Sequence, residues 1–104
     1  MKRLLLVVLA VLISVPVVYA ASVGGGNIVY KVKHSGDVTF SHDSHVTDRN
    51  FKCDDCHPSI FAMKRDAEKK RKMSDMRSKK ACGICHNGKN AFDVSSNCYI
   101  CHKK

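Results

Sequence analysis

The pentapeptide Cys53-Asp54-Asp55-Cys56-His57 sets the organisation of this 104-residue chain, because its pattern occurs three times. The Cys-x-x-Cys-His spacing returns in Cys82-Gly83-Ile84-Cys85-His86 and in Cys98-Tyr99-Ile100-Cys101-His102. Together the three copies use all six cysteines in pairs, and a histidine follows each second cysteine. Only six histidines are present in the chain, so three such coincidences are improbable by chance. We therefore interpret the pentapeptide as a repeated chemical unit.

This Cys-x-x-Cys-His unit is typical of covalent haem c attachment. Two thiols one helical turn apart can add to the two vinyl groups of one haem, and the imidazole of the next residue reaches the iron. The sequence therefore predicts three covalently attached haem c groups. The expected attachment residues are Cys53, Cys56, Cys82, Cys85, Cys98 and Cys101. The expected iron ligands from the same units are His57, His86 and His102.

Two other uses of paired cysteines fit the sequence less well. A structural zinc ion takes four ligands, so three cysteine pairs would leave one pair without a partner. A disulfide framework is common in exported proteins, and six cysteines allow 15 pairings. Disulfides, however, give no reason for the three histidines that follow the pairs. A scaffold held by zinc or by disulfides is therefore the disfavoured alternative.

The remaining histidines are candidates for the second axial ligands of the irons. His42 and His45 are three residues apart in the segment 40–45. If this segment is helical, both imidazoles leave one face with their Cβ atoms roughly 5–6 Å apart. Each could then bind a different iron and hold two haems close together; the alternative is that both are surface histidines. His34 lies beside Ser35-Gly36 in a predicted turn, where we expect it to face solvent.

One haem then lacks a second histidine, and three methionines could supply its ligand. They are Met63, Met73 and Met76. A thioether sulfur binds haem iron and raises its reduction potential relative to a second histidine. We favour Met76 over Met73 and place Met63 third. The alternative is that these flexible side chains pack against the porphyrin faces.

The first twenty residues have the form of a secretory signal peptide. Lys2 and Arg3 precede an apolar run over residues 4–18, and the following Tyr19-Ala20 suits a cleavage site. This run of fifteen residues contains a proline and is shorter than the roughly 18–20 residues of a membrane span, which makes an uncleaved anchor the weaker alternative. We therefore expect residues 1–20 to be a cleaved signal peptide and the mature protein to be periplasmic.

The mature chain has few apolar residues for a core. Outside the cysteines, residues 21–104 contain 24 apolar residues and no tryptophan. A domain this small needs disulfides, a metal or a cofactor to stabilise its fold, and the predicted haems would fill its interior. Residues 21–27 have the composition of a flexible lead, and residues 28–104 form the expected triheme domain. Within it we expect strands at 28–33 and 38–40 and a helix inside 61–78.

The charge balance indicates a negatively charged partner. The formal charge is +9, and loss of Lys2 and Arg3 with the signal peptide leaves +7. Three haems with ionised propionates lower this to about +4 when oxidised and about +1 when reduced. The remaining cations are concentrated in Lys64–Lys72, which is either a solvated helix face or a docking surface for an acidic redox protein such as another cytochrome. We expect a monomer that binds no nucleic acid and does not stay inserted in the membrane.

In its cysteine units and in the segment that holds His42 and His45, the chain resembles the triheme cytochrome c7 family. The members of this family are relatives of the cytochromes c3 with one haem fewer. The resemblance covers residues 27–104 and includes the hairpin, the Phe-x-His-x-x-His segment and the three Cys-x-x-Cys-His units. It implies a small multihaem cytochrome c fold of the c3/c7 type. Such a fold is mainly helical and irregular, with a short N-terminal β-hairpin and a haem-filled core.

The resemblance also implies how the irons are ligated. His42 would serve the haem attached next to His57, and His45 would serve the haem attached next to His86. Where typical members carry a histidine before the second unit, this chain has the segment 73–80 with two methionines. This is similar to a variant of the family in which one haem has a His/Met pair. On that resemblance Met76 serves the haem attached next to His102.

The function that the resemblance implies is electron transport without enzymatic chemistry. The protein would carry single electrons between redox proteins of a respiratory chain, with extracellular metal oxides among the possible acceptors. Two strong axial ligands leave no open position at the iron, which disfavours substrate chemistry. The alternative is a multihaem reductase that acts on a small substrate or metal ion at a weakly ligated third haem. High-spin iron, or carbon monoxide binding to the reduced protein, would favour that alternative.

Overall fold

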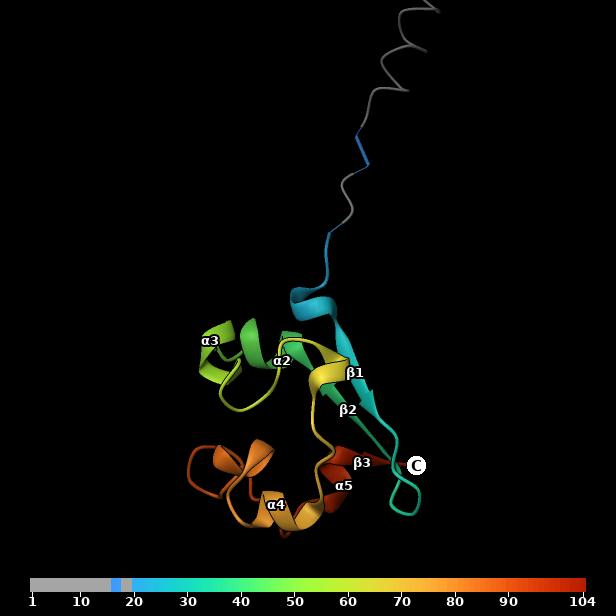
Figure 1. The fold of residues 1–104 in the computed structure, drawn as a ribbon, viewed down its shortest axis with the longest axis vertical. Coiled ribbons are helices and arrows are strands. Elements are labelled where there is room, and N and C mark those ends of the chain that lie inside the picture. Colours follow the sequence, from blue (N-terminus) through green and yellow to red (C-terminus); the bar gives the residue numbers. More distant parts are fainter. Residues whose placement is uncertain (1–15, 18–19) are drawn as a thin grey trace, which may run out of the picture.

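The computed structural model of the chain describes residues 16–17 and 20–104 (Figure 1). Most of the predicted signal peptide, residues 1–20, lies outside the described residues. Within the part that is described, no helix combines the length and the apolar character that a membrane crossing requires. The fold below therefore concerns the predicted lead and the predicted triheme domain.

The predicted hairpin is present and belongs to a three-stranded antiparallel sheet, but its first strand ends at residue 30 and not at residue 33 as predicted. β1 (Asn27–Tyr30) pairs with β2 (Asp37–Ser41). β3 (His102–Lys103) pairs with the other side of β2 and places His102 opposite Val38. The sequence did not predict β3, because two residues are too few to show the alternation of a strand. This third strand ties the last Cys-x-x-Cys-His unit to the N-terminal hairpin.

The helices are all short, and three of them coincide with the cysteine units. They are the 3₁₀ turn η1 (Val23–Gly25), α2 (His42–Val46), α3 (Cys53–Cys56), the 3₁₀ turn η2 (Arg65–Ala67), α4 (Met73–Arg77), the 3₁₀ turn η3 (Ala81–Ile84) and α5 (Cys98–Cys101). α2 begins directly where β2 ends, because Ser41 caps it: its Oγ accepts the Ser44 N–H at 3.1 Å. The helical geometry expected around His42 and His45 is therefore present.

The prediction of a helix inside 61–78 is only partly correct. The segment forms η2 and α4, and residues 68–72 between them have no regular structure. Glu68 and Arg71 use their side chains on a loop instead: Glu68 accepts the Ala62 N–H at 2.7 Å and the Arg71 Nε–H at 3.0 Å. These bonds fold the segment into a loop that a continuous helix would not allow.

The chain packs around an interior that it fills poorly by itself. Among the described residues, Ala81 is the only buried apolar side chain, at 4 % exposure, and no large side chain is fully buried. Met63 and Tyr99 are 70 % exposed. In Figure 1, α2 and α3 lie in the upper part of the folded region and α4 in the lower part, with the sheet along the right edge. The polypeptide thus forms no apolar core of its own in the described residues, in agreement with the small number of apolar residues.

Candidate haem-binding site

Five histidines share one hydrogen-bonding geometry. Each of their Nδ1 atoms lies at hydrogen-bonding distance from a backbone carbonyl oxygen. The pairs are His42 with Gly26 at 2.7 Å, His45 with Ser41 at 2.9 Å, His57 with Phe61 at 2.8 Å, His86 with Phe92 at 3.2 Å and His102 with Gly36 at 2.9 Å. A carbonyl oxygen can only accept, so each neutral ring must carry its proton on Nδ1 and donate it. The lone pair of each Nε2 is then free for a metal.

These five histidines are the five that the sequence analysis selected as iron ligands. His34, the sixth histidine, is exposed in a turn, as expected. Burial lowers the pKa of His86, and the nearby His45 lowers it further, while the bond to Phe92 acts in the opposite direction. The pKa shift favours the neutral imidazole, which is the form that binds a metal.

The three Cys-x-x-Cys-His units share one backbone hydrogen bond. Each begins with one helical turn, in α3, η3 or α5, and the histidine N–H donates to the carbonyl of the first cysteine. That bond is 2.9 Å long from His57 to Cys53 and from His86 to Cys82. The turn sets the two thiols of a unit one helical turn apart, as attachment to one haem requires.

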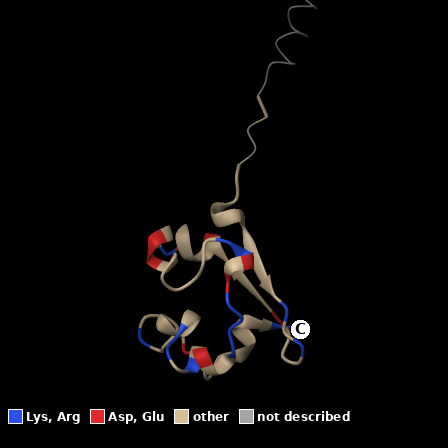
Figure 2. Ribbon diagram, viewed as in Figure 1, with Lys and Arg blue, Asp and Glu red and all other residues tan. Residues whose placement is uncertain are grey.

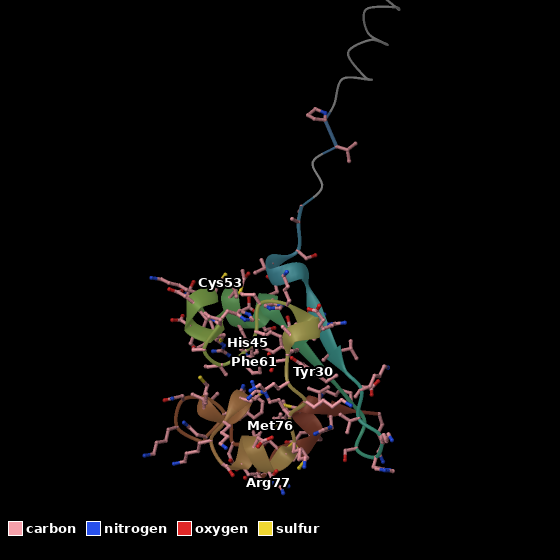
Figure 3. The ribbon with its side chains drawn as sticks, viewed as in Figure 1. Tyr30, His45, Cys53, Phe61, Met76 and Arg77 are labelled. Carbon is pink, nitrogen blue, oxygen red and sulfur yellow. The ribbon has the colours of Figure 1, made fainter. Side chains whose placement is uncertain are left out.

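The cysteines are free thiols in the structure and lie at the surface or just below it. Cys53, labelled in Figure 3, and Cys98 are exposed, and the other four are half-buried. Burial raises the pKa of the Cys56, Cys82 and Cys101 thiols. Each unit thus has at least one half-buried cysteine.

His42 and His45 leave α2 together and share an aromatic neighbour. The ring of Phe40 lies edge-on to His42 at 5.0 Å between centroids and stacks on His45 at 4.5 Å. Phe40 therefore restricts the rotation of both imidazoles. Phe40 belongs to the Phe-x-His-x-x-His segment, but the sequence alone indicates no role for its side chain.

His45 and His86 come together from distant parts of the chain. Their ring centroids are 6.2 Å apart, with 65° between the ring planes. Two imidazoles that bind opposite sides of one metal through Nε2 have centroids about 6 Å apart, since each metal–nitrogen bond is about 2 Å. Figure 3 shows His45 near the middle of the folded region, between the α2 side and the α4 side. The observed separation suits a pair of ligands on one iron.

The methionines differ in exposure and in position. Met63 is 70 % exposed, whereas Met73 and Met76 on α4 are half-buried. Met76 lies toward the middle of the molecule in Figure 3, and Arg77 lies at the outer edge. The backbone of Met76 packs against Gly83 inside the second cysteine unit. A Cβ added to Gly83 would lie 2.7 Å from the Met76 carbonyl carbon and closer still to its oxygen.

The donor set of the chain fits haem c. Five imidazoles present a free Nε2, three thiol pairs stand one helical turn apart, and large buried side chains are absent from the described residues. The carbonyl partners of the histidines could not be predicted from the sequence, because every residue carries a carbonyl and no residue type marks the one that is used. The sequence also did not predict the close approach at Gly83, which appears only once α4 and η3 are placed together.

Comparison with known proteins agrees with this donor set. A family model described as cytochrome c7 and related cytochrome c matches residues 38–103. Among solved structures, the chain is similar to a c7-type three-heme cytochrome domain, with 43 % identity and a TM-score of 0.68. That match covers 74 % of this chain and 91 % of the domain. No curated protein sequence matches the chain.

Longer cytochromes also contain a similar unit. The dodecaheme cytochrome c GSU1996 is 40 % identical, with a TM-score of 0.68, over 76 % of this chain and 24 % of that protein. Its C-terminal hexaheme fragment is 42 % identical, with a TM-score of 0.66, over 73 % of this chain and 46 % of the fragment. The chain thus spans about a quarter of the dodecaheme protein and about half of the fragment.

Proposed function

The chain belongs to the cytochrome c7 family, and from this membership we propose that it is a periplasmic carrier of single electrons with three haems. Its fold is that of a small c7-type multihaem cytochrome, and its cofactor is haem c. We propose in particular that the chain binds three haems, that each iron has the pair of protein ligands given below, and that the protein is periplasmic. The observation that carries it is the shared geometry of the five histidines, each with Nδ1 on a carbonyl.

The proposed ligation follows the three cysteine units. The haem on Cys53 and Cys56 has His57 and His42; the haem on Cys82 and Cys85 has His86 and His45; the haem on Cys98 and Cys101 has His102 and Met76. The 6.2 Å separation of His45 and His86 supports the second assignment. The exposure of Met63 favours a methionine of α4 for the third.

The protein residues set what the haems can do. Haem c, when bound, supplies an iron that gains and loses one electron reversibly. His45 and His86 would be the two protein ligands of one iron, which would then have no position open for a substrate. His42 and His45 lie on one short helix, and they would therefore bring two different haems close together. Such an arrangement suits electron transfer and gives no room for bond chemistry.

The basic segment Lys64–Lys72 supports docking of an acidic redox protein. Arg71 and Glu68 are used inside the loop, where Arg71 donates to Glu68 at 3.0 Å and to the Ile60 carbonyl at 2.7 Å. Five other cations of the segment are exposed: Lys64, Arg65, Lys69, Lys70 and Lys72. Figure 2 shows Lys and Arg along the connection from η2 to α4. In this proposal the protein acts as a monomer in a respiratory chain.

The intact mass and the absorption spectrum of the exported protein test the proposal. We expect a chain that begins at Ala21 and carries the mass of three haems, together with a Soret band and low-spin spectra. A chain without added haem, or with zinc or disulfides at the cysteines, would refute it. Carbon monoxide binding at one haem of the unmodified reduced protein would instead favour a reductase, because that result requires an open or weakly held iron position.

A further inference from the structure

The segment before the hairpin contacts an iron ligand. The sequence predicted a flexible lead at residues 21–27, but Val23–Gly25 form the turn η1, which packs against α2. Gly26 follows the turn, and its carbonyl accepts the Nδ1–H of His42 at 2.7 Å. Among the described residues, this bond to the lead is the only hydrogen bond that the His42 ring makes.

Gly24 lies directly against the same ring. Its φ is +60°, in the left-handed region that glycine adopts without strain. A Cβ added to Gly24 would lie 2.6 Å from His42 Cγ and 2.8 Å from its Nε2. Such distances are well inside van der Waals contact, so no larger residue fits here unless the ring moves. The ring atoms that would be displaced include Nε2, which is the nitrogen left free to bind iron.

We propose that the turn Ser22–Gly26 is a positioning element for His42, with Gly24 as the residue that lets the backbone close over the imidazole. The proposal rests on the assignment of His42 as an iron ligand. Gly26 orients the ring through Nδ1, and the backbone at Gly24 limits its rotation. Groups that orient a metal-bound histidine in this manner are typically worth 10–100-fold in metal affinity. The lead thus holds the second ligand of the first haem.

Gly25 provides a matched control for a substitution at Gly24. Its φ is +80°, so alanine is strained there as well, but a Cβ at this position meets nothing within 4 Å. Gly24→Ala and Gly25→Ala therefore share the backbone cost and differ in the contact with His42. Both are compared as mature holoproteins, after mass spectrometry has established three haems per chain.

The readout is carbon monoxide binding to the reduced protein. We expect Gly24→Ala to bind carbon monoxide at the first haem at least about tenfold more strongly than Gly25→Ala or the parent protein, with a matching high-spin signal when oxidised. Equal binding by the two alanine variants would overturn the proposal. If Gly24→Ala does not mature, a chain that lacks residues 21–24 removes the contact without a clash and must show the same gain.

A third variant, His42→Ala, distinguishes a failure of the ligand assignment from a failure of the positioning role. If His42→Ala binds carbon monoxide at one haem while Gly24→Ala behaves like Gly25→Ala, His42 is a ligand and the positioning role is wrong. If His42→Ala stays low-spin and binds no carbon monoxide beyond the parent level, the ligand assignment itself fails and the positioning role fails with it. If both His42→Ala and Gly24→Ala bind it and Gly25→Ala does not, both inferences stand.

Discussion

At the scale of single residues, hydrogen bonds to carbonyls decide which histidines can act as iron ligands. His57 and His86 are placed by the covalent units, but His42 and His45 are not, and spacing alone could not separate them from surface histidines. Their Nδ1 atoms lie 2.7 Å and 2.9 Å from carbonyl oxygens, which is the arrangement that the proposed ligation through Nε2 requires. The proton must be on Nδ1, so Nε2 is an acceptor with no proton to lose on metal binding.

The prediction at the scale of single residues concerns Met76 as the ligand of the third haem. Replacing Met76 with histidine should lower the reduction potential of the third haem by on the order of 100 mV, because a second imidazole favours the oxidised iron more than a thioether does. The weak absorption band of a methionine–iron bond should disappear at the same time. A potentiometric titration followed by absorption measures both effects.

Met73 and Met63 serve as the controls for this prediction. Met73 is on the same helix and half-buried, and Met63 is 70 % exposed, so Met73→Leu and Met63→Leu keep an apolar side chain of similar size. Both variants should keep the potential and the band of the parent protein. Loss of the band in Met73→Leu, with Met76→His unchanged, would move the ligand to Met73.

At the scale of elements, short helices are a consequence of where the ligands must be. α3, η3 and α5 are single turns, because one turn is all that the thiol spacing requires. Between η2 and α4 the chain forms a loop held by Glu68 and Arg71, with Arg71 also 5.5 Å from the centre of the Phe61 ring. Through Arg71 the loop contacts a residue of the site, since the carbonyl of Phe61 accepts the Nδ1–H of His57 at 2.8 Å.

This loop leads to a prediction about partner docking. Reversing the charge of Lys69 and Lys70 to glutamate should slow electron exchange with an acidic c-type cytochrome about tenfold at low ionic strength, because steering by surface charge is lost. The dependence of the rate on salt should also weaken. Stopped-flow rates across a salt series measure both.

Lys33 and Lys89 offer a control with the same change in net charge. Both are exposed and belong to other elements, the hairpin turn and the segment after the second cysteine unit. Their double charge reversal should change the rate clearly less than the reversal at Lys69 and Lys70. Equal effects of the two double variants would show that the overall charge of the protein, and not the segment Lys64–Lys72, determines the rate.

The parts of the fold that sequence predicted are those fixed by local chemistry. The cysteine units and the helical spacing of His42 and His45 depend on residues within about five positions of one another, where propensity and covalent geometry act directly. The hairpin joins two neighbouring strands through one short turn that the sequence marks with Ser35-Gly36. The remainder depends on contacts across the chain. His102 donates to the Gly36 carbonyl across 66 positions, and Gly83 meets Met76 only after α4 and η3 have packed. No single residue type signals either contact.

At the scale of the whole molecule, the polypeptide has too little buried apolar surface to stay folded alone. Ala81 is the one buried apolar side chain among the described residues, and the other apolar side chains are partly or largely exposed. Ordering each residue costs about 1–2 kcal/mol of backbone entropy, which burial of apolar surface normally offsets. In this protein the offset must come from the haem faces and from the bonds that the cysteines and histidines make to the haems.

The protein without haem should therefore be largely unfolded. A chain produced without haem attachment, with its cysteines kept reduced, should show little helical signal in far-UV circular dichroism and no cooperative thermal transition, whereas the holoprotein shows both. A variant with all six cysteines replaced by serine excludes disulfide exchange as the cause and should behave like the reduced chain. A cooperative transition in either haem-free chain would mean that the sheet and short helices stabilise one another. In that case the polypeptide would fold without haem, and the haems would bind to a preformed structure.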